Sequence, residues 1–404
     1  MPLEGALAYH DTYNLNRPEL LYKGEVHGPE SLTVRDNIIY AGLATGEIVA
    51  LKNDTLSVVA DLLQPCRGFW DFENCGRPLG LAFDKKGSLF VADAYYGIYK
   101  INVTTGNYSL IVPSSEPIAT NSTLEEIPML PNAVTLAADG TIYWSDSSTK
   151  LPLHNLVIGL FGDKSGRLIK TNPETGKSEV LMSGLRFANG IFLADDESYI
   201  AVAECFQQRV LRYWLKGPKK GQSEIFMDNL PGTPDNMTPW IEGGFIVNLL
   251  LRSNPIINFL APYPAVRKGI AGSICLVEKA FEWFDQYFPS DFNKEAIAFV
   301  GHFNSVAFFT QSYSIALFCD KDGNILKSLH ADDGYFSVSE VVPLGNYYYF
   351  GSPSNDFIGK TDRLYLYILP EVPSSFGTWQ NLMSTFYCKM DVLKVKAFLH
   401  CHDV

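Results

Sequence analysis

The stretch Pro131–Asp146, PNAVTLAADGTIYWSD, decides the fold that we predict for this chain. An apolar run that starts at Asn132 leads into the turn Asp139-Gly140, and a second apolar run, IYW, follows and ends at Asp146. An Asp-Gly turn between two such runs is typical of a β-hairpin. The pattern therefore predicts a hairpin whose first strand begins with a residue that carries a neutral oxygen ligand.

Hairpins with the same layout recur along the chain. In four of them the residue that starts the first strand lies eight residues before the turn: Leu79 before Gly87, Asn132 before Gly140, Asn189 before Glu197, and Asp235 before Gly243. Glu30 begins a further copy with a turn one residue shorter, and Ser339 begins a sixth copy of less regular register. Such repetition is typical of propeller blades of four strands each. We therefore predict an all-β fold, a six-bladed β-propeller.

The β pattern is interrupted within the fifth blade. From about residue 255 to 304 the apolar residues follow helical spacing, as in AVRKGIAGSICLVEKAFEWFDQYF, which predicts a helical insertion that caps one face. We expect the propeller to span residues 1–370, with 19–22 as an outer strand that joins the last blade. Residues 371–404 contain few hairpin signals and are expected to form a C-terminal tail.

Composition argues against two classes of partner. The chain has 404 residues, a formal net charge of -12 and 19% charged residues. Nucleic acids and anionic membrane surfaces bind basic patches, so neither is an expected partner. Ordinary solubility accounts for the acidity. No run of eighteen or more apolar residues occurs, so we expect no membrane span within this chain.

Cysteines and glycosylation signals indicate the compartment. Cys66 and Cys75 lie in one loop, PCRGFWDFENCG, and are either a disulfide, which we favour, or two unpaired thiols. Asparagines in Asn-X-Ser/Thr sequons are glycosylation acceptors. Five are present: Asn53, Asn102, Asn107, Asn121 and Asn236. Both signals favour a glycoprotein of the extracellular space or of the secretory-pathway lumen.

The repeat places oxygen ligands at corresponding positions. In a propeller the first strand of each blade lines the central channel, so the residues that begin these strands are expected to converge. The candidate metal ligands are Glu30, Asn132, Asn189, Asp235 and Asn236. Carboxylates and carboxamides are hard oxygen ligands that suit Ca²⁺. The alternative is that Asn and Asp only start strands and cap turns. The common register favours the metal site.

Short motifs at these positions are similar to those of a known family: HGPES (27–31), CGRPLGL (75–81), PNAVT (131–135), DSS (146–148), GRLIK (166–170), FANGI (187–191) and PDN (234–236). As a set they resemble the strictosidine synthase-like family. Over about residues 25–365 the chain also resembles the wider six-bladed superfamily of paraoxonases, squid-type phosphotriesterases and gluconolactonases. The blade-five insertion resembles the animal branch that includes adipocyte plasma membrane-associated protein and hemomucin.

The resemblance implies a catalytic Ca²⁺ held by a blade-one glutamate, asparagines of blades three and four, and a blade-five aspartate. These correspond to Glu30, Asn132, Asn189 and Asp235, and Asn236 matches the Asp-Asn pair of the paraoxonases. Hydrolytic members use Ca²⁺ as a Lewis acid on a lactone carbonyl or phosphoryl oxygen. Attack is then by water or by the metal-bound aspartate, here Asp235. The implied partner is a small-molecule ester or lactone.

Two departures from the family pattern limit what the resemblance implies. Paraoxonases have a histidine, thought to act as general base, where this chain has Leu79. His27 and His154 are the candidate substitutes, and we expect both to be structural or solvent-facing. The plant synthase's glutamate aligns with Ser339, beside Glu340, and a one-residue shift reverses a side chain's face in a strand.

Three functional hypotheses remain. The first is a calcium-dependent hydrolase of lactones, aryl esters or related electrophiles, with Asp235 as the catalytic residue. The second is a non-catalytic, calcium-stabilised propeller for binding or adhesion, which the leucine at the histidine position favours. The third is condensation of the plant type, which Ser339 disfavours.

Overall fold

The computed structural model describes residues 3–8, 15, 17–64, 66–121, 124–240, 243–253, 259–301, 313–331 and 337–363. All of them belong to one compact unit, Met1–Leu364. The predicted tail, residues 371–404, lies outside the described residues. The predicted domain boundary at residue 370 therefore stays a prediction.

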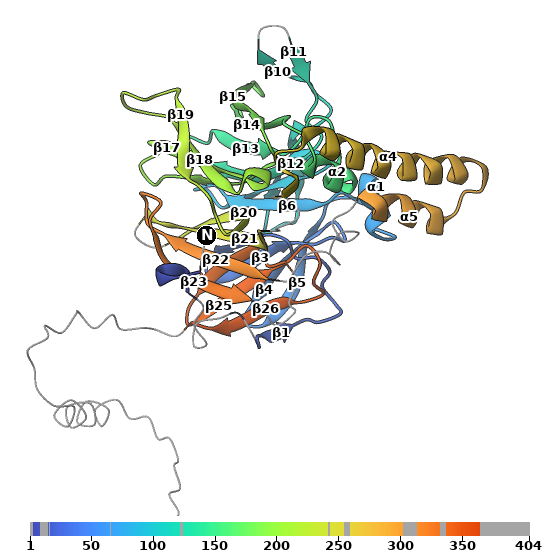
Figure 1. Cartoon of the computed structure of the whole chain (residues 1–404). Helices are drawn as coiled ribbons and strands as arrows, with labels where there is room; N and C mark the ends of the chain where they lie inside the picture. Colours follow the sequence, from blue (N-terminus) through green and yellow to red (C-terminus); the bar gives the residue numbers. More distant parts are fainter. Residues whose placement is uncertain are drawn as a thin grey trace, which may run out of the picture. The chain divides into compact units, whose positions relative to one another are not determined.

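Four-stranded antiparallel sheets make up most of the fold (Figure 1). The first sheet contains β2 (Leu32–Arg35), β3 (Ile38–Gly42), β4 (Glu47–Lys52) and β5 (Thr55–Asp61). The second contains β6 (Pro78–Phe83), β7 (Ser88–Asp93), β8 (Gly97–Asn102) and β9 (Tyr108–Pro113). The third contains β12 (Pro131–Leu136), β13 (Ile142–Asp146), β14 (Gly166–Thr171) and β15 (Ser178–Leu185).

The fourth sheet contains β16 (Ala188–Leu193), β17 (Tyr199–Glu204), β18 (Arg209–Trp214) and β19 (Ser223–Met227). The fifth contains β20 (Gly232–Pro239), β21 (Phe245–Arg252), β22 (Ser314–Cys319) and β23 (Ile325–Ala331). The last contains β24 (Glu340–Leu344), β25 (Tyr347–Gly351), β26 (Ile358–Asp362) and β1 (Glu19–Leu21). A separate hairpin joins β10 (Ile118–Asn121) to β11 (Leu124–Glu126).

The last sheet is completed by the N-terminal strand. β1 pairs antiparallel with β26, with Leu21 opposite Ile358. This pairing confirms the outer strand predicted at 19–22. Because β1 comes from the start of the chain and β24, β25 and β26 come from its later part, their hydrogen bonds tie distant segments into one sheet.

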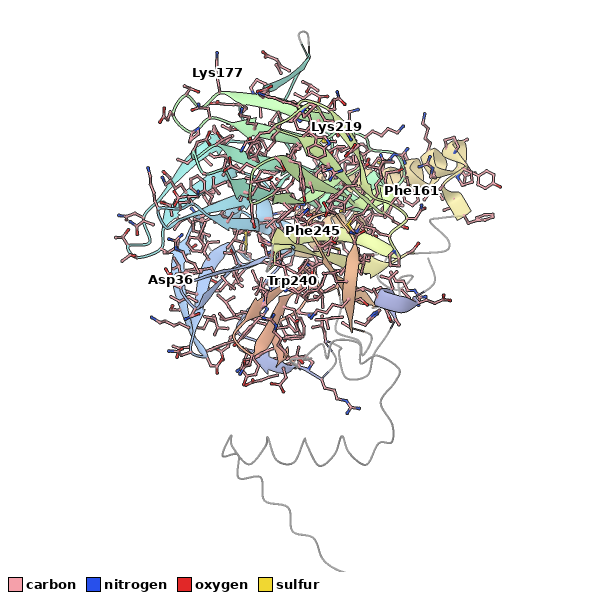
Figure 2. All side chains as sticks on the ribbon, turned by 90° about the vertical axis from the view of Figure 1, so that its left-hand side faces the viewer. Asp36, Phe161, Lys177, Lys219, Trp240 and Phe245 are labelled. Carbon is pink, nitrogen blue, oxygen red and sulfur yellow. A yellow bond between two sulfur atoms is a disulfide. The ribbon has the colours of Figure 1, made fainter. Side chains whose placement is uncertain are left out.

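The first strands of successive sheets contact one another in a closed order: β2 with β6, β6 with β12, β12 with β16, β16 with β20, β20 with β24, and β24 with β2. Buried apolar side chains fill the spaces between neighbouring sheets, as where Phe192 of β16 meets Phe245 of β21 with ring centroids 4.8 Å apart. Figure 2 shows Phe245 in this interior and Asp36 and Lys177 at the periphery. The sheets are therefore held together mainly by apolar contact between their faces.

The hairpin turns keep the register that the repeat predicts. Gly140 has φ +90° in the turn between β12 and β13, a left-handed conformation that glycine adopts without strain. At the corresponding position of the fourth sheet, Glu197 has φ 53°. Its Oε1 accepts a 2.6 Å hydrogen bond from the backbone N–H of Ala138 in the neighbouring turn. That bond between sheets gives a physical reason for a non-glycine residue at this turn.

Helical segments lie between strands. The 3₁₀ turns are η1 (Gly5–Leu7), η2 (Phe69–Asp71), η3 (Leu153–Asn155) and η4 (Cys205–Gln207), and the short helices are α1 (Phe72–Cys75) and α2 (Leu156–Leu160). The long helices α4 (Pro264–Tyr287) and α5 (Asp291–Gly301) lie between β21 and β22, strands of a single sheet, as the helical spacing predicted. None of the helices in the described residues is long and apolar enough to span a membrane.

The loop before β6 is closed by a disulfide. Cys66 and Cys75 are bonded, with their Cα atoms 5.2 Å apart, which confirms the predicted pairing. Asp71, inside this loop, accepts hydrogen bonds from the Arg67 side chain. The hydrogen-bonded Arg67 side chain is the main reason why the pKa of the Asp71 carboxyl lies well below its usual range. The loop is thus fixed by both a covalent bond and an ion pair.

Candidate metal site

Four first strands carry the same irregularity at the same place. The pairing register shifts between Pro78 and Gly80 in β6, Pro131 and Val134 in β12, Ala188 and Ile191 in β16, and Pro234 and Met237 in β20. A β-bulge leaves residues out of the ladder and changes the direction of their side chains. Among the bulge residues are Leu79, Asn132, Asn189, Asp235 and Asn236. Bulges therefore present the predicted ligands of three strands, and Leu79 in the fourth.

Glycines that follow two of these bulge residues permit close strand approach. A Cβ added to Gly190 would lie 2.3 Å from the carbonyl oxygen of Asp235, and one added to Gly80 would lie 2.5 Å from that of Asn132. Both positions require glycine for lack of space, because real Cβ atoms do not approach backbone oxygens so closely. The Leu-Gly and Asn-Gly pairs of the sequence thus bring the first strands together at the level of the candidate ligands.

Direct hydrogen bonds join four of the candidate ligands. Nδ2 of Asn236 donates to Oε1 of Glu30 at 3.0 Å, although the two residues are 206 positions apart in the chain. Nδ2 of Asn189 donates to Oδ1 of Asp235. Each of these side chains is at most 4% exposed. Because Asp235 and Asn236 are adjacent, the bonds form one buried network that starts before β2 and reaches β16.

Asn132 is linked to this network through Ser147. Its Nδ2 donates to Oγ of Ser147 at 3.0 Å, and the Ser147 hydroxyl donates to the carbonyl oxygen of Ala188 at 2.6 Å. Ala188 directly precedes Asn189. Ser147 therefore holds the carboxamide of Asn132 in a fixed orientation, with its nitrogen used in a hydrogen bond and its oxygen left for another partner.

Three oxygens of the candidate ligands are buried without a hydrogen-bond partner. They are Oε2 of Glu30, Oδ1 of Asn132 and Oδ1 of Asn189. A buried polar atom without a partner costs about 1 to 3 kcal/mol, so three such atoms in one network need an explanation. All three are hard oxygen donors, and a Ca²⁺ ion would satisfy them. The residues present therefore fit calcium.

The type of donor also matters for the choice of metal. The described residues contain no group of three or more His, Cys, Asp or Glu side chains that could hold a metal ion. The candidate set instead combines two carboxylates with three carboxamides. Such an oxygen set suits Ca²⁺ rather than the nitrogen and sulfur sites that zinc prefers.

Electrostatics agree with a cation at this position. Burial, followed by the negative charge of Asp235, raises the pKa of Glu30 well above its usual value. Burial also raises the pKa of Asp235 to about 8, with a further contribution from Glu340. Arg77 is the cationic side chain that acts on Glu30, and its own pKa is lowered to about 10, chiefly by burial. A bound cation would favour the ionised form of both carboxylates.

Glu340 is a buried carboxylate to which the sequence patterns assigned no role. Its Oε2 accepts hydrogen bonds from the Ser31 hydroxyl at 2.6 Å and the Leu32 N–H at 2.7 Å, and its Oε1 accepts one from Thr238 Oγ1 at 2.7 Å. Ser31 and Leu32 directly follow Glu30 in the chain, and Thr238 lies two residues after Asn236. Glu340 therefore joins the last sheet to the strands that carry two candidate ligands. Its position at the start of β24, the first strand of the last sheet, is the sequence signal that could have identified it.

A small cavity lies beside this carboxylate. Its volume is about 30 Å³, and the lining includes Ser31, Gly80, Gly190, Asn236 and Glu340. Because these residues lie in the first strands of four sheets or directly before the first strand of a fifth, the cavity marks where the first strands meet. The cavity is large enough to hold a water molecule.

The side chain of Leu79 is 5% exposed and packs in an apolar cluster with Phe72, Leu130, Leu153 and Phe187. The cluster is formed by loops that precede or follow the bulged strands. At position 79 the chain thus presents hydrocarbon surface and no proton acceptor.

The two histidines considered as substitutes have different surroundings. His27 is exposed. His154 lies in η3, where burial lowers its pKa, and its carbonyl oxygen lies close to Gly301 of α5. These surroundings agree with solvent-facing and structural roles, respectively.

Comparison with known proteins identifies the family. Residues 132–218 match the family model described as strictosidine synthase, and residues 13–51 match the one described as strictosidine synthase-like, N-terminal. The adipocyte plasma membrane-associated protein of Rattus norvegicus is 31% identical, over 85% of this chain and 85% of its own length. This chain belongs to the strictosidine synthase-like family. Its animal relatives also include hemomucin of Drosophila melanogaster, 37% identical over 89% of this chain; the match spans 62% of that protein's length.

Solved structures similar to this strictosidine synthase-like chain are propellers. A gluconolactonase from Xanthomonas campestris aligns with a TM-score of 0.52 and 12% identity, over 87% of this chain and 93% of that protein. A putative gluconolactonase aligns with a TM-score of 0.50 and 12% identity, over 88% and 93%. At this identity the likeness concerns the fold alone. It supports an all-β propeller architecture.

Proposed function

We propose that the chain is a six-bladed propeller that binds Ca²⁺ and hydrolyses lactones, aryl esters or related electrophiles. The proposed ligands are Glu30, Asn132, Asn189, Asp235 and Asn236. The closed order of contacts between first strands supports the six blades. The observation that carries the metal site is the set of three buried oxygens without partners, on three different strands or strand entries of one network.

The chain's own residues suit the attack step. Bound Ca²⁺ would supply Lewis-acid chemistry for a carbonyl or phosphoryl oxygen. Asp235 would act either as the nucleophile or as the acceptor that orients a water molecule. Asn189 holds Oδ1 of Asp235 and would keep the other carboxylate oxygen in a defined direction. The apolar cluster around Leu79 would favour apolar parts of a substrate and exclude water.

A non-catalytic propeller, stabilised by calcium and used for binding or adhesion, is the second candidate. The observation that favours it is the packing of Leu79, which leaves hydrocarbon at the position of the paraoxonase histidine. Condensation of the plant type has less support. The Ser339 hydroxyl donates to the carbonyl oxygen of Glu30, and the Glu340 carboxylate already accepts three hydrogen bonds. Both groups therefore already have hydrogen-bond partners within the protein.

We propose that the protein works in the extracellular space or in the secretory-pathway lumen. The disulfide supports an oxidising compartment, and relatives carry plasma membrane association in their names. The sequons at Asn53, Asn102 and Asn107 are exposed and suited to glycosylation. Asn236 is 3% exposed and bonded to Glu30, so its sequon is inaccessible once the chain is folded.

Hydrolysis with a panel of lactones and aryl esters tests the proposal. Activity is expected to disappear with a calcium chelator and to return when Ca²⁺ is restored. Asp235→Asn is expected to lower kcat at least about 100-fold, in line with the loss of one group that acts on the reacting atoms. Full turnover of Asp235→Asn on every ester that the parent hydrolyses would show that the hydrolase assignment is wrong.

A matched control is available in the fourth sheet. Glu204 is a buried carboxylate, 2% exposed, that accepts a 2.6 Å hydrogen bond from Nε of Arg209. Glu204→Gln removes a buried charge of the same kind outside the candidate ligand set. It should retain the parent's turnover and calcium dependence. If neither protein hydrolyses any ester but Ca²⁺ still stabilises the parent, the binding propeller is the correct alternative.

A further inference from the structure

Helix α4 exposes an apolar face. Eleven of the eighteen large apolar side chains that are exposed in the described residues lie between 259 and 301. On α4 they include Leu276, Trp283 and Tyr287, which are spaced seven and four residues apart and so share one side of the helix. Amphipathic helices of soluble proteins normally turn such a stripe inward. Here the stripe is left uncovered by the described chain.

The inward side of α4 combines half-buried apolar residues, among them Ile270, Ile274 and Phe281, with a buried carboxylate. Glu278 is 5% exposed, and α4 contacts α2 and α5. Burial raises the pKa of Glu278, and a hydrogen bond with Asn155 opposes that rise. The buried position of Glu278 shows that the exposed stripe is not the side with which α4 packs against the protein. The helix is held to the protein by its other face.

Aromatic residues are concentrated where α4 ends and α5 begins. Trp283 is 63% exposed, Phe288 63% and Phe292 74%. The rings of Trp283 and Tyr287 are tilted against each other, with centroids 5.1 Å apart. Figure 1 shows this end of the helical pair extending beyond the sheets. We call Trp283, Phe284, Tyr287, Phe288 and Phe292 the aromatic tip.

The aromatic tip has no excess of basic residues. Lys279 lies 3.7 Å from Glu282, and Asp291 lies 4.0 Å from Lys294 and 3.8 Å from Arg67. Two further acidic residues, Asp285 and Glu295, lie in the same stretch, so the tip does not attract an anionic surface. A protruding aromatic tip without a basic excess instead matches the headgroup region of a zwitterionic bilayer, where Trp and Tyr are enriched.

We propose that the aromatic tip inserts into the interface of a zwitterionic phospholipid membrane and docks the protein there without spanning the bilayer. Helix α4 would lie in the plane of the interface with its exposed stripe toward the acyl chains. Because α5 contacts η2 and η3, and these loops border the apolar cluster around Leu79, docking would bring that cluster near the lipid. The proposal does not depend on calcium or on hydrolysis.

Vesicle flotation with the full-length protein and phosphatidylcholine vesicles tests the proposal. The parent should float with the vesicles, and 1 M NaCl should change the partition coefficient less than twofold, because the attraction is apolar. The variant Trp283→Ser/Phe288→Ser/Phe292→Ser should lower the partition coefficient at least tenfold. A parent that stays in solution, or a triple variant that floats like the parent, would overturn the proposal.

Exposed apolar residues of the sheets provide the matched control. Val58, Ile225 and Leu326 are 59%, 50% and 53% exposed, so Val58→Ser/Ile225→Ser/Leu326→Ser removes three exposed apolar side chains elsewhere. This variant should float like the parent. Circular dichroism should show that both triple variants are folded. Equal loss of flotation in both would mean that general surface hydrophobicity, and not the aromatic tip, drives binding.

A second measurement locates the tip directly. Brominated phosphatidylcholine should quench the parent's tryptophan fluorescence, and Trp283→Phe should remain bound but lose most of that quenching. Unchanged quenching in Trp283→Phe would contradict insertion at the tip. If instead a second copy or the chain's own residues 365–404 cover the stripe, the parent will not float. A second copy would also give a dimer in analytical ultracentrifugation that the tip variant dissociates.

Discussion

Replacing Glu30 by Gln should change stability in opposite directions with and without calcium. The substitution keeps the shape of the side chain and removes a buried negative charge whose pKa is raised by burial and by Asp235. In the presence of chelator at pH 8, the variant should therefore be at least as stable as the parent, because an unpaired buried charge costs more than an unpaired amide. With calcium, the same change removes one of two carboxylate ligands.

The size of the calcium effect follows from the contacts of Glu30. Its Oε2 has no protein partner, so the loss concerns one interaction with a charged group, worth about 1.5 to 3 kcal/mol. This corresponds to roughly 10- to 100-fold weaker binding. At a Ca²⁺ concentration 100 times the parent's Kd, calcium stabilises the parent by about 2.7 kcal/mol and the variant by only about 0.4 to 1.4 kcal/mol.

Thermal unfolding with calcium or chelator measures this difference. At about 2 °C per kcal/mol for a protein of this size, the parent's Tm should rise by about 5 °C with Ca²⁺ and the variant's by about 1 to 3 °C. Glu204→Gln is the control, and it should lower Tm under both conditions while keeping the parent's calcium-induced rise. A Glu30→Gln protein with the full rise, or with a clearly lower Tm than the parent in chelator, would refute the reasoning.

Three further outcomes are expected. Without calcium, the free energy of unfolding should fall as pH rises from about 4 to 8, by up to about 1.4 kcal/mol per pH unit. The reason is that Asp235, with its folded pKa of about 8, keeps a proton that the unfolded chain has released. Urea titrations in chelator that show a flat or rising trend would contradict this. Arg167→Met should cost about 3 to 5 kcal/mol by leaving Asp146, fully buried and 2.6 Å from the guanidinium, without its partner; an unchanged urea midpoint would contradict it. Glu340→Gln should cost about 1 to 3 kcal/mol with or without calcium, because an amide cannot accept all three hydrogen bonds of the carboxylate; a loss seen only with calcium would instead make Glu340 part of the metal site.

Much of the candidate site follows from the repeat. The eight-residue spacing from Asn132 to Gly140 recurs from Asn189 to Glu197, and the structure gives the turn residues the same left-handed backbone. Strand alternation and turn chemistry depend on neighbours in the chain, so aligned copies predict which residues begin the first strands. For the same reason the outer strand at 19–22 and the helical insertion could be predicted before their partners were known.

Other features were beyond the reach of sequence patterns. The bulge that redirects Asn132 depends on the partner strand, and the role of Glu340 depends on Ser31 and Thr238, which are remote from it in the chain. The helical spacing of 255–304 showed an apolar face, but it did not show that the face would remain exposed on α4.

The sequence by itself determined the repeating hairpins, their turns and the oxygen-bearing residues at the strand starts. Tertiary structure decided which of these oxygens are buried without a partner and which apolar surface stays uncovered. It also decided that the Glu340 carboxylate joins the last sheet to strands of other sheets. The physical reason is the separation along the chain of the residues that interact. Backbone conformation responds to adjacent residues, whereas the burial of charge and hydrocarbon is settled only when segments far apart in the chain pack together.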